Sequence, residues 1–323
     1  MRRALISVYN KEGIINFAKE LVHIGWEIIS TGGTSKVLQD AGIDIIEVEN
    51  ITNFPEILDG RVKTLNPYIH GGLLYKRDNE KHIKTIRDLN ISSIDMVVNN
   101  LYPFEETINN PESSYEDIIE NIDIGGPSMI RAAAKNFKFV TVIVDPGDYD
   151  KVLDELKKYN DTCIKTREYL ASKVFNYTAY YDALIANFFN DCVNIKYPEN
   201  ITLPLTKIQD LRYGENPHQS AAFYKKAYKV NGTITSGHQI HGKELSFNNI
   251  NDSNGALKIL KEFNEPTIVA VKHSNPCGIG SGEDLLEAYI KAYECDKESI
   301  YGGIIAANRE IDRDVAAKIN EIF

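Results

Sequence analysis

Residues 123–136 read DIGGPSMIRAAAKN, and this stretch decides how the rest of the chain is interpreted. It opens with a carboxylate, and two glycines then allow close approach of the backbone. Pro127 suits the first position of a helix, because its missing N–H costs nothing there. The start of such a helix offers free N–H groups and partial positive charge, which suits an anion or a developing oxyanion. A tightly packed helix with a solvated basic face explains the same residues equally well.

Two cations, Arg131 and Lys135, lie four residues apart and share one face of this predicted helix. Lys135 lies roughly 12 Å along the axis from the Gly-Gly turn, at about 1.5 Å per residue. It therefore meets the same ligand as Asp123 only if the ligand lies along the helix or the chain bends sharply around Gly125.

Short apolar runs, each typical of a buried strand, recur on both sides of this stretch. They are Ala4–Val8, Trp26–Ile29, Ile45–Val48, Ile94–Val98 and Val140–Val144. Amphipathic helical patterns separate them, and the first such pattern has Asn10 as its expected cap and ends at Gly25. Strands that alternate with helices predict an α/β fold with a doubly wound parallel sheet.

Polar segments follow several of these runs. Residues 31–34, TGGT, form a Gly-rich turn between strand and helix, the layout of a phosphate cradle, although an ordinary glycine turn fits as well. Arg61, Lys63 and Thr64 stand in a loop bounded by Gly and Pro, where a solvated loop is the alternative. Asn99, Asn100 and Tyr102 follow a central strand, at the edge where open α/β sheets bind ligands.

The second half of the chain begins after a long predicted helix, Lys165–Asn190. We expect a first domain at 1–194, a linker at 195–206 and a second domain at 207–323. A buried strand, Thr267–Val271, runs into Lys272 and His273, which together suit acid–base chemistry. A strand-end histidine bonded to a loop, or a nucleophile pair of His273 with Cys277, are the alternatives.

Composition narrows the class of protein. The 323 residues carry a net charge of −10, which disfavours binding to nucleic acid or to an anionic membrane. No apolar run is long enough to span a bilayer. The four cysteines show no CxxC spacing and read as reduced thiols in a cytoplasmic protein. His238 and His241 have no further ligand at metal-site spacing, so no metal is expected.

Taken together and in order, the motifs resemble the family of the bifunctional purine-biosynthesis enzyme AICAR transformylase/IMP cyclohydrolase. The matching segments are residues 31–34, 60–65, 100–104, 123–126, 131–136, 211–214 and 272–273. The resemblance implies a methylglyoxal-synthase-like sheet, followed by part of a cytidine-deaminase-like α/β transformylase domain. The family's second domain is longer than the segment after Leu211, so we expect a C-terminally truncated chain.

The resemblance also implies the reactions, which are the last two steps of IMP synthesis. AICAR takes a formyl group from 10-formyltetrahydrofolate, and formyl-AICAR then closes to IMP with loss of water. The folate is the co-substrate of the first step, and the ring closure needs no cofactor. We expect this chain alone to perform only the ring closure, as a cytoplasmic homodimer whose partners are these nucleotides and folate.

The site residues are implied by the same resemblance. Catalysis of ring closure falls to Lys63, Tyr102, Asp123 and Lys135, and formyl transfer to Lys272 and His273. Substrate binding falls to Ser7, Asn10, Lys11, Thr31, Gly32, Gly33, Thr34, Arg61, Thr64, Asn99, Asn100, Ile124, Gly125, Gly126, Arg212, Tyr213 and Gly302. One departure is Tyr9-Asn10, where the family usually has Ser-Asp.

Two other functions remain open for the first domain. It can act as a sensor of a phosphorylated ligand, which needs the phosphate cradle but not the combination of Lys63, Tyr102, Asp123 and Lys135. It can also be a lyase of the methylglyoxal-synthase type, which dihydroxyacetone phosphate would reveal as substrate.

Overall fold

The computed structural model describes residues 2–228 and 230–321. The chain divides into two compact units, Met1–Pro204 and Leu205–Phe323. Residues 195–204 of the predicted linker are thus grouped with the first unit, and the Asn187 side chain donates to the Thr202 carbonyl at 3.0 Å. Residues 205 and 206 of that linker already belong to the first strand of the second unit.

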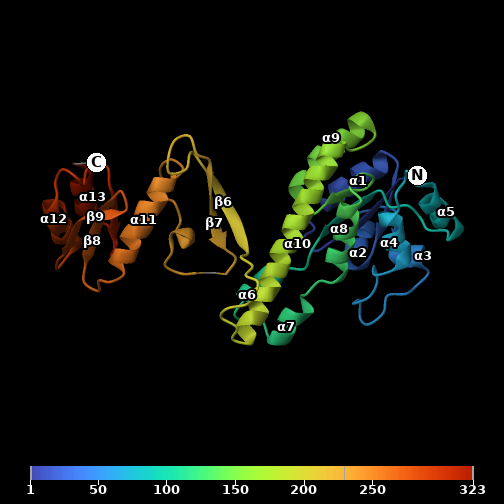
Figure 1. The fold of residues 1–323 in the computed structure, drawn as a ribbon, viewed down its shortest axis with the longest axis horizontal. Helices are drawn as coiled ribbons and strands as arrows, with labels where there is room; N and C mark the ends of the chain where they lie inside the picture. The colour runs from blue at the N-terminus through green and yellow to red at the C-terminus, as the bar shows by residue number, and fades with distance from the viewer. Residues whose placement is uncertain (1, 229, 322–323) are drawn as a thin grey trace. The chain divides into compact units, whose positions relative to one another are not determined.

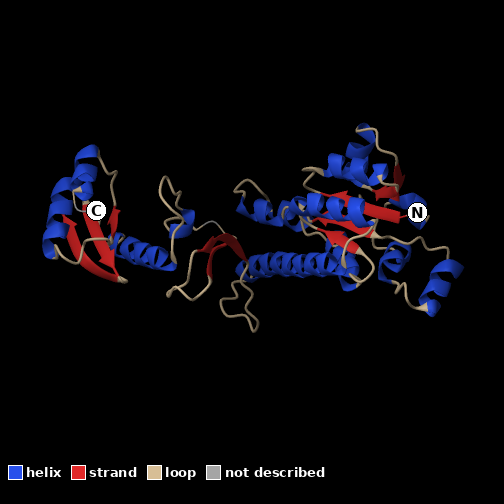
Figure 2. Cartoon of the chain, turned by 90° about the horizontal axis from the view of Figure 1, so that it is seen from above, coloured by secondary structure: helices blue, strands red, loops and turns tan. Residues whose placement is uncertain are grey.

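The first unit is built on a parallel sheet of five strands. They are β1 (Arg2–Val8), β2 (Trp26–Ser30), β3 (Ile45–Glu47), β4 (Met96–Asn100) and β5 (Thr141–Ile143). Their order is β3-β2-β1-β4-β5, and every neighbouring pair is parallel. Figure 2 shows helices on both faces of this sheet. The predicted doubly wound parallel sheet is confirmed, and each of the five apolar runs overlaps one strand.

Helices connect the strands. They are α1 (Ile14–His23), α2 (Gly32–Asp40), α3 (Val48–Thr52), α4 (Pro67–Leu74), α5 (Glu80–Asp88), α6 (Phe104–Asn109), α7 (Tyr115–Glu120), α8 (Gly125–Lys135), α9 (Tyr149–Tyr159) and α10 (Ile164–Cys192), with a 3-10 turn, η1, at Pro146–Asp148. The long helix α10 runs beside α8 (Figure 1).

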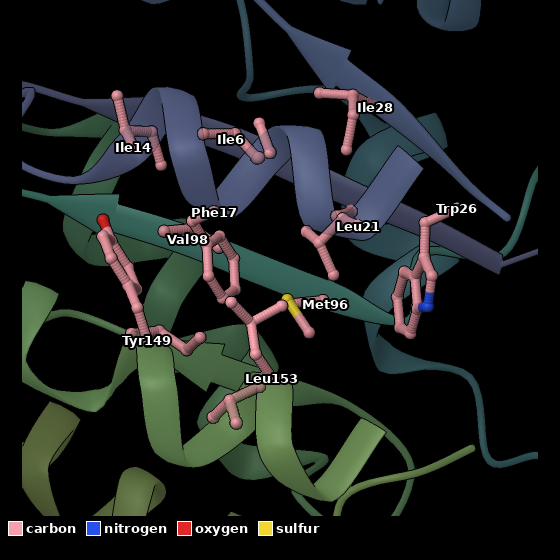
Figure 3. Close-up of a cluster of buried hydrophobic side chains, with 14 of the residues drawn as sticks. Ile6, Ile14, Phe17, Leu21, Trp26, Ile28, Met96, Val98, Tyr149 and Leu153 are labelled. Carbon is pink, nitrogen blue, oxygen red and sulfur yellow. The ribbon is translucent and has the colours of Figure 1, made fainter. Parts of the chain in front are cut away.

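The core on one sheet face lies under α1 and α9. Ile6 of β1 packs there with Phe17 of α1 and Leu153 of α9, as Figure 3 shows. The rings of Phe17 and Tyr149 stack with centroids 4.4 Å apart. Leu5, whose side chain points to the opposite face, is fully buried as well. Burial on both faces explains why these strands read as continuous apolar runs.

Two predicted helix starts are wrong. Helix α8 begins at Gly125 and not at Pro127, so both glycines lie in its first turn. Pro127 is tolerated there because the first N–H groups of any helix lack a partner within the helix. Helix α1 has Gly13 in the capping position, with φ 67°, and not Asn10. The Asn10 carboxamide oxygen instead accepts from the Glu12 N–H at 2.9 Å, in a local turn.

The second unit contains two antiparallel sheets. Strands β6 (Leu205–Leu211) and β7 (Ala221–Lys226) form one, and the order β10-β8-β9 forms the other, from β8 (Thr267–Lys272), β9 (Asn275–Ser281) and β10 (Ile304–Ala307). The remaining elements are η2 (Ile234–Ser236), α11 (Phe247–Leu260), α12 (Leu285–Cys295) and α13 (Arg313–Asn320). Val269 of β8 packs with Leu260 of α11, whereas Ile268 packs with Ala288 of α12.

Candidate functional site

A cavity of about 910 Å³ lies at the carboxyl ends of β1 and β4. Ser7 pairs with Asn99 across these two strands, and Val8 pairs with Asn100. The chain leaves β1 for β2 on one side of the sheet, and β4 leads to β5 on the other. Such a switch point is where open α/β sheets bind ligands.

Every first-domain residue predicted for the site lines this cavity except Asn10 and Lys135. Those that line it are Ser7, Lys11, Thr31, Gly32, Gly33, Thr34, Arg61, Lys63, Thr64, Asn99, Asn100, Tyr102, Asp123, Ile124, Gly125 and Gly126. The cavity thus brings together segments from separate parts of the sequence.

The turn after β1 is fixed by Asn100. Its carboxamide oxygen accepts from the N–H groups of Tyr9 and Asn10 at 2.6 and 2.8 Å. Its carboxamide nitrogen donates to the Asn10 carbonyl at 3.2 Å. Asn10 is thereby held through its backbone, which explains how it serves the turn without lining the cavity.

The Gly-rich turn places the start of α2 on the cavity. Gly32 is the first residue of the helix and has φ 56°, a conformation that favours glycine. A Cβ at Gly32 would lie 3.3 Å from Lys63 Nζ, so a side chain would crowd the amine. Lys11 also lines the cavity, and burial lowers the pKa of its amine. Free N–H groups beside two amines suit a phosphate.

Two carboxylates that pair with cations of the cavity were not predicted from the sequence. Glu56 lies 3.5 Å from the amine of Lys63, and Glu120 forms an ion pair with Arg61. Both glutamates line the cavity. No sequence signal points to them, because the pairs join residues 7 and 59 positions apart through a loop whose course the sequence does not reveal.

Asp123 is the most deeply held acid of the cavity. Its Oδ1 accepts from the Gly126 N–H at 2.8 Å, and the backbone N–H of Tyr102 also favours the charged form of the carboxylate. Burial raises the pKa of Asp123, while these two N–H groups and the charge of Lys63 act in the opposite direction. A buried carboxyl with a raised pKa is a proton acceptor suited to neutral pH.

Asn99 gives the cavity a second acceptor beside Asp123. Its nitrogen donates to the Ser7 carbonyl, whereas its oxygen has no hydrogen-bond partner within the described chain, although the residue is only 4% exposed. A Cβ at Gly126 would lie 2.5 Å from Asp123 Oδ2 and 3.0 Å from Asn99 Oδ1. The two oxygens therefore lie close together beside Gly126, and the Asn99 oxygen is a buried acceptor without a donor among the described residues.

Tyr102 stands at the mouth of the cavity. Its ring is half exposed and meets the ring of Tyr9 edge-on, with centroids 6.4 Å apart. The unusual Tyr9 therefore packs on the predicted catalytic phenol, which explains how the turn accommodates its bulk.

Lys135 lines a different hollow from the one that contains Asp123. It lies there with Arg131, His70 and Phe175, and Arg131 stacks on the Phe175 ring at 5.4 Å. The whole length of α8 separates Lys135 from Gly125, which is roughly 15 Å at 1.5 Å per residue. Within the described protomer, Lys135 and Asp123 therefore do not share a cavity.

In the second unit, Lys272 and His273 lie at the tight turn between β8 and β9. His273 and Ser274 have φ 53° and 65°, and their N–H groups donate to the Asp252 carboxylate at 3.3 and 2.7 Å. Lys272 donates to the carbonyl of Tyr301, directly before Gly302. This joins three of the predicted residues of the second domain.

Arg212 and Tyr213 follow β6 in the other sheet, where the guanidinium lies 5.7 Å from the phenol ring centroid. Among the described residues, no hydrogen bond or ring contact joins either of them to Lys272 or His273.

Comparison with known proteins covers both units. A family model described as "AICARFT/IMPCHase bienzyme" matches residues 133–323, and one described as "MGS-like domain" matches residues 13–128. The chain is 58% identical over 325 residues to the "Bifunctional purine biosynthesis protein PurH" of Caldicellulosiruptor saccharolyticus. It is 58% identical over 322 residues to the protein of the same name from Bacillus cytotoxicus. Each alignment covers this whole chain and 63% of the relative, so the chain spans 63% of the length of these relatives.

A solved structure, "Crystal structure of ForH", shares the fold over part of the chain. It aligns with a TM-score of 0.52 and 35% identity. The alignment covers 58% of this chain and 98% of that one.

Proposed function

Because the chain belongs to the AICARFT/IMPCHase bienzyme family, we propose that its first unit closes the ring of formyl-AICAR to give IMP and water. The observation that carries this proposal is the cavity at the β1/β4 switch point. It holds the buried Asp123, the amine of Lys63 and the phenol of Tyr102 beside a phosphate cradle at α2. A site that only senses a phosphorylated ligand needs the cradle but not the buried acid.

Asp123 and Asn99 suit the nucleophile of this reaction. The carboxamide nitrogen of formyl-AICAR attacks the formyl carbon and must lose a proton. Asp123, a mostly buried carboxylate that lines the cavity, accepts from this amide and takes its proton, and Asn99 lies beside it. Holding the amide against the formyl carbon supplies a large part of the acceleration.

Lys63 and Tyr102 suit the electrophile. Negative charge develops on the formyl oxygen as the nitrogen attacks, and that oxygen leaves as water. A fixed amine and a phenol at the cavity wall stabilise such charge more strongly than water does. The start of α2, with Lys11 and Arg61 nearby, takes the phosphate, and the Lys63 amine lies close to this cradle, 3.3 Å from where a Cβ at Gly32 would lie.

Lys135 keeps its proposed role as the proton donor to the departing water, but from a second copy of the chain. Its own hollow is separate from the cavity that holds Asp123. In a homodimer, Lys135 of one copy can reach the cavity of the other copy. This arrangement reconciles the catalytic role of Lys135 with its distance from Asp123 in one copy. Mixing Lys135→Ala and Asp123→Ala proteins then restores activity, because some mixed dimers contain one complete site. No restoration after subunit exchange would contradict this arrangement.

For the second unit we propose a share in the formyl transfer that precedes ring closure, and we expect this chain by itself to perform only the ring closure. His273 takes the proton of the attacking amine of AICAR, and Lys272 stabilises the charge on the formyl group of 10-formyltetrahydrofolate. Arg212, Tyr213 and Gly302 hold the nucleotide or the folate. We also propose a cytoplasmic location. No helix among the described residues is long and apolar enough to cross a membrane.

The test supplies formyl-AICAR to the purified chain and follows IMP by mass spectrometry. We expect IMP from the unaltered chain, with turnover lowered by roughly 10²-fold or more in Lys63→Ala and Asp123→Ala. Parallel incubation with dihydroxyacetone phosphate tests the lyase alternative. Methylglyoxal without IMP would establish the lyase instead, and binding of formyl-AICAR without turnover would favour a sensor.

A further inference from the structure

Two tyrosines of α10 reach the segments that carry the catalytic groups. Tyr177 and Tyr181 lie four residues apart and so share one face of the helix. The Leu101 N–H donates to the Tyr177 hydroxyl at 3.0 Å. The Asp123 N–H donates to the Tyr181 hydroxyl at 2.9 Å, and that hydroxyl in turn donates to the Asn121 carbonyl at 2.8 Å.

These backbone groups belong to the two loops on which the site depends. Leu101 directly precedes Tyr102 in the loop after β4, and Asp123 stands in the loop before α8. The two loops also lie close together, because a Cβ at Gly126 would meet both Asp123 Oδ2 at 2.5 Å and Leu101 Cδ2 at 2.8 Å, and the Tyr102 N–H lowers the pKa of Asp123. The two phenols thus bind the backbone of both loops, while Tyr102 and Asp123 of the same loops line the cavity.

Both phenols are suited to a permanent structural bond. Tyr181 is only 4% exposed, and Tyr177 is partly buried. Burial raises the pKa of both hydroxyls, and the negative charge of Asp123 acts in the same direction. Each therefore stays neutral across the physiological range and keeps its hydrogen-bonding pattern.

We propose that Tyr177 and Tyr181 are positioning residues of the site, whose hydroxyls hold residues 101–102 and 121–123 at the spacing that lets Tyr102 and Asp123 act on one ligand. The consequence for turnover rests on the proposed ring closure, whereas the consequence for the two loops does not.

The experiment compares Tyr177→Phe and Tyr181→Phe with Tyr180→Phe in the full chain. Tyr180 lies between them on α10, and its hydroxyl donates to a side chain of α6, Glu105, at 2.7 Å. All three variants therefore remove one hydroxyl from the same helix. Two readouts are taken: kcat and KM for formyl-AICAR across pH, and hydrogen exchange at the amides of Leu101 and Asp123.

We expect Tyr177→Phe and Tyr181→Phe to lower kcat by roughly 10- to 100-fold with a smaller change in KM, since displacement by about an ångström costs up to ~10²-fold. The acid limb of the kcat profile should move to higher pH, because a displaced Tyr102 N–H no longer favours the charged Asp123. The titratable groups around that carboxyl are Lys63, Tyr177 and Tyr181. Exchange should quicken about fivefold at Leu101 in the first variant and at Asp123 in the second, the scale of one net hydrogen bond.

Tyr180→Phe should match the unaltered chain in the pH profile and in exchange at both amides. The positioning role is overturned if all three variants share the same kcat and the same acid limb. If the unaltered chain makes no IMP, the proposed function fails, and amide exchange alone then decides the inference. Unchanged exchange at Leu101 and Asp123 would overturn it in either case.

Discussion

The burial of Asp123 serves its proposed role as a base, but it lowers the stability of the fold at neutral pH, where the carboxyl is charged. Its carboxyl is mostly buried, and burial raises its pKa in the folded protein. The folded chain therefore binds this proton more tightly than the unfolded chain does. The stabilisation is fully present below the ordinary pKa of an aspartate and is lost as the pH rises through the folded value.

The first prediction concerns this opposition. Asp123→Asn should raise the free energy of unfolding at pH 7, because the variant buries no charge while its oxygen still accepts from Gly126. The gain should shrink in acid, where Asp123 is already neutral. Urea unfolding at pH 7 and at low pH measures both, with Asp88→Asn at the exposed end of α5 as the control for loss of one charge. Turnover should fall by ~10²-fold or more. A variant less stable than the unaltered chain at pH 7 would contradict this account.

The second prediction concerns Gly126, which has no room for a side chain. A Cβ there would meet Asp123 Oδ2 at 2.5 Å and Leu101 Cδ2 at 2.8 Å. Gly126→Ala should therefore lower the free energy of unfolding by about 1–3 kcal/mol, the usual cost of overpacking. Gly33→Ala is the matched control for stability, since Gly33 also lies at the start of a helix and a Cβ there meets nothing within 4 Å. Equal thermal midpoints for the two variants would refute the steric argument.

For individual residues, the sequence predicted which positions after strands or before helices come together at the cavity. Tyr102 follows β4 and Asp123 precedes α8, and parallel strands bring such positions to one edge, whereas Lys63 stands in a loop and was assigned by the family resemblance. It could not predict Glu56 or Tyr181, whose roles come from tertiary contacts across a loop and between helices. Lys135 was assigned to catalysis together with Asp123, although the length of the predicted helix already placed the two far apart. In the structure Lys135 lines a separate hollow.

Among the elements of the first unit, α10 connects several segments that are far apart in the sequence. It packs on α8 and β5, and Lys173 also joins it to η1. The Lys173 amine lies 2.6 Å from Asp145 Oδ2 and 2.5 Å from Asp148 Oδ2, and the Asp148 side chain is 8% exposed. This one amine therefore compensates two carboxylates, one of which is buried.

The third prediction removes that amine. Lys173→Met should lower the free energy of unfolding by about 1.5–3 kcal/mol at pH 7, the scale of hydrogen bonds to charged groups. The hydrogen bond from Lys173 lowers the pKa of Asp145, so its share is present above the ordinary aspartate pKa and is lost as the pH falls through the folded value. Urea unfolding across pH measures this. Lys138→Met, which breaks the exposed pair with Asp78, should change little. Similar losses from both substitutions would show that the buried Asp148 is not the cause.

The sequence was a good guide to the existence of elements and a poorer one to their ends. Each apolar run became a strand because β-branched and aliphatic residues suit a sheet that is buried on both faces. Helix α8 begins two residues earlier than expected, at Gly125, because the loop before it is held by contacts that the local sequence does not show.

In the whole molecule, the two units differ in what they contribute. All residues that line the cavity lie between Ser7 and Met129, and α10 lies within the same unit. The strand order β3-β2-β1-β4-β5 could not be read from the sequence, because it depends on pairing between distant segments. The parallel arrangement itself followed from the alternation of strands and helices.

The fourth prediction is that residues 1–204 form an autonomous cyclohydrolase. They form a compact unit that contains the complete cavity and both tyrosines of α10. The isolated segment should unfold in one cooperative transition and convert formyl-AICAR with a kcat similar to that of the full chain. Circular dichroism on heating and IMP formation measure the two properties. A folded segment without activity would show that residues beyond 204 are required for ring closure.

The pairing of β1 with β4 also has a consequence for synthesis on the ribosome. Ala4 has its neighbour Met96 92 positions later in the chain. At ~5–20 residues per second, the growing chain needs roughly 5–20 seconds to reach Asn100, the end of β4. During that time β1 is an unpaired edge on its inner side, exposed to chaperones and to other nascent chains. The hydroxyls of Tyr177 and Tyr181 are made later still, so the cavity reaches its final form only when α10 has left the ribosome and docked.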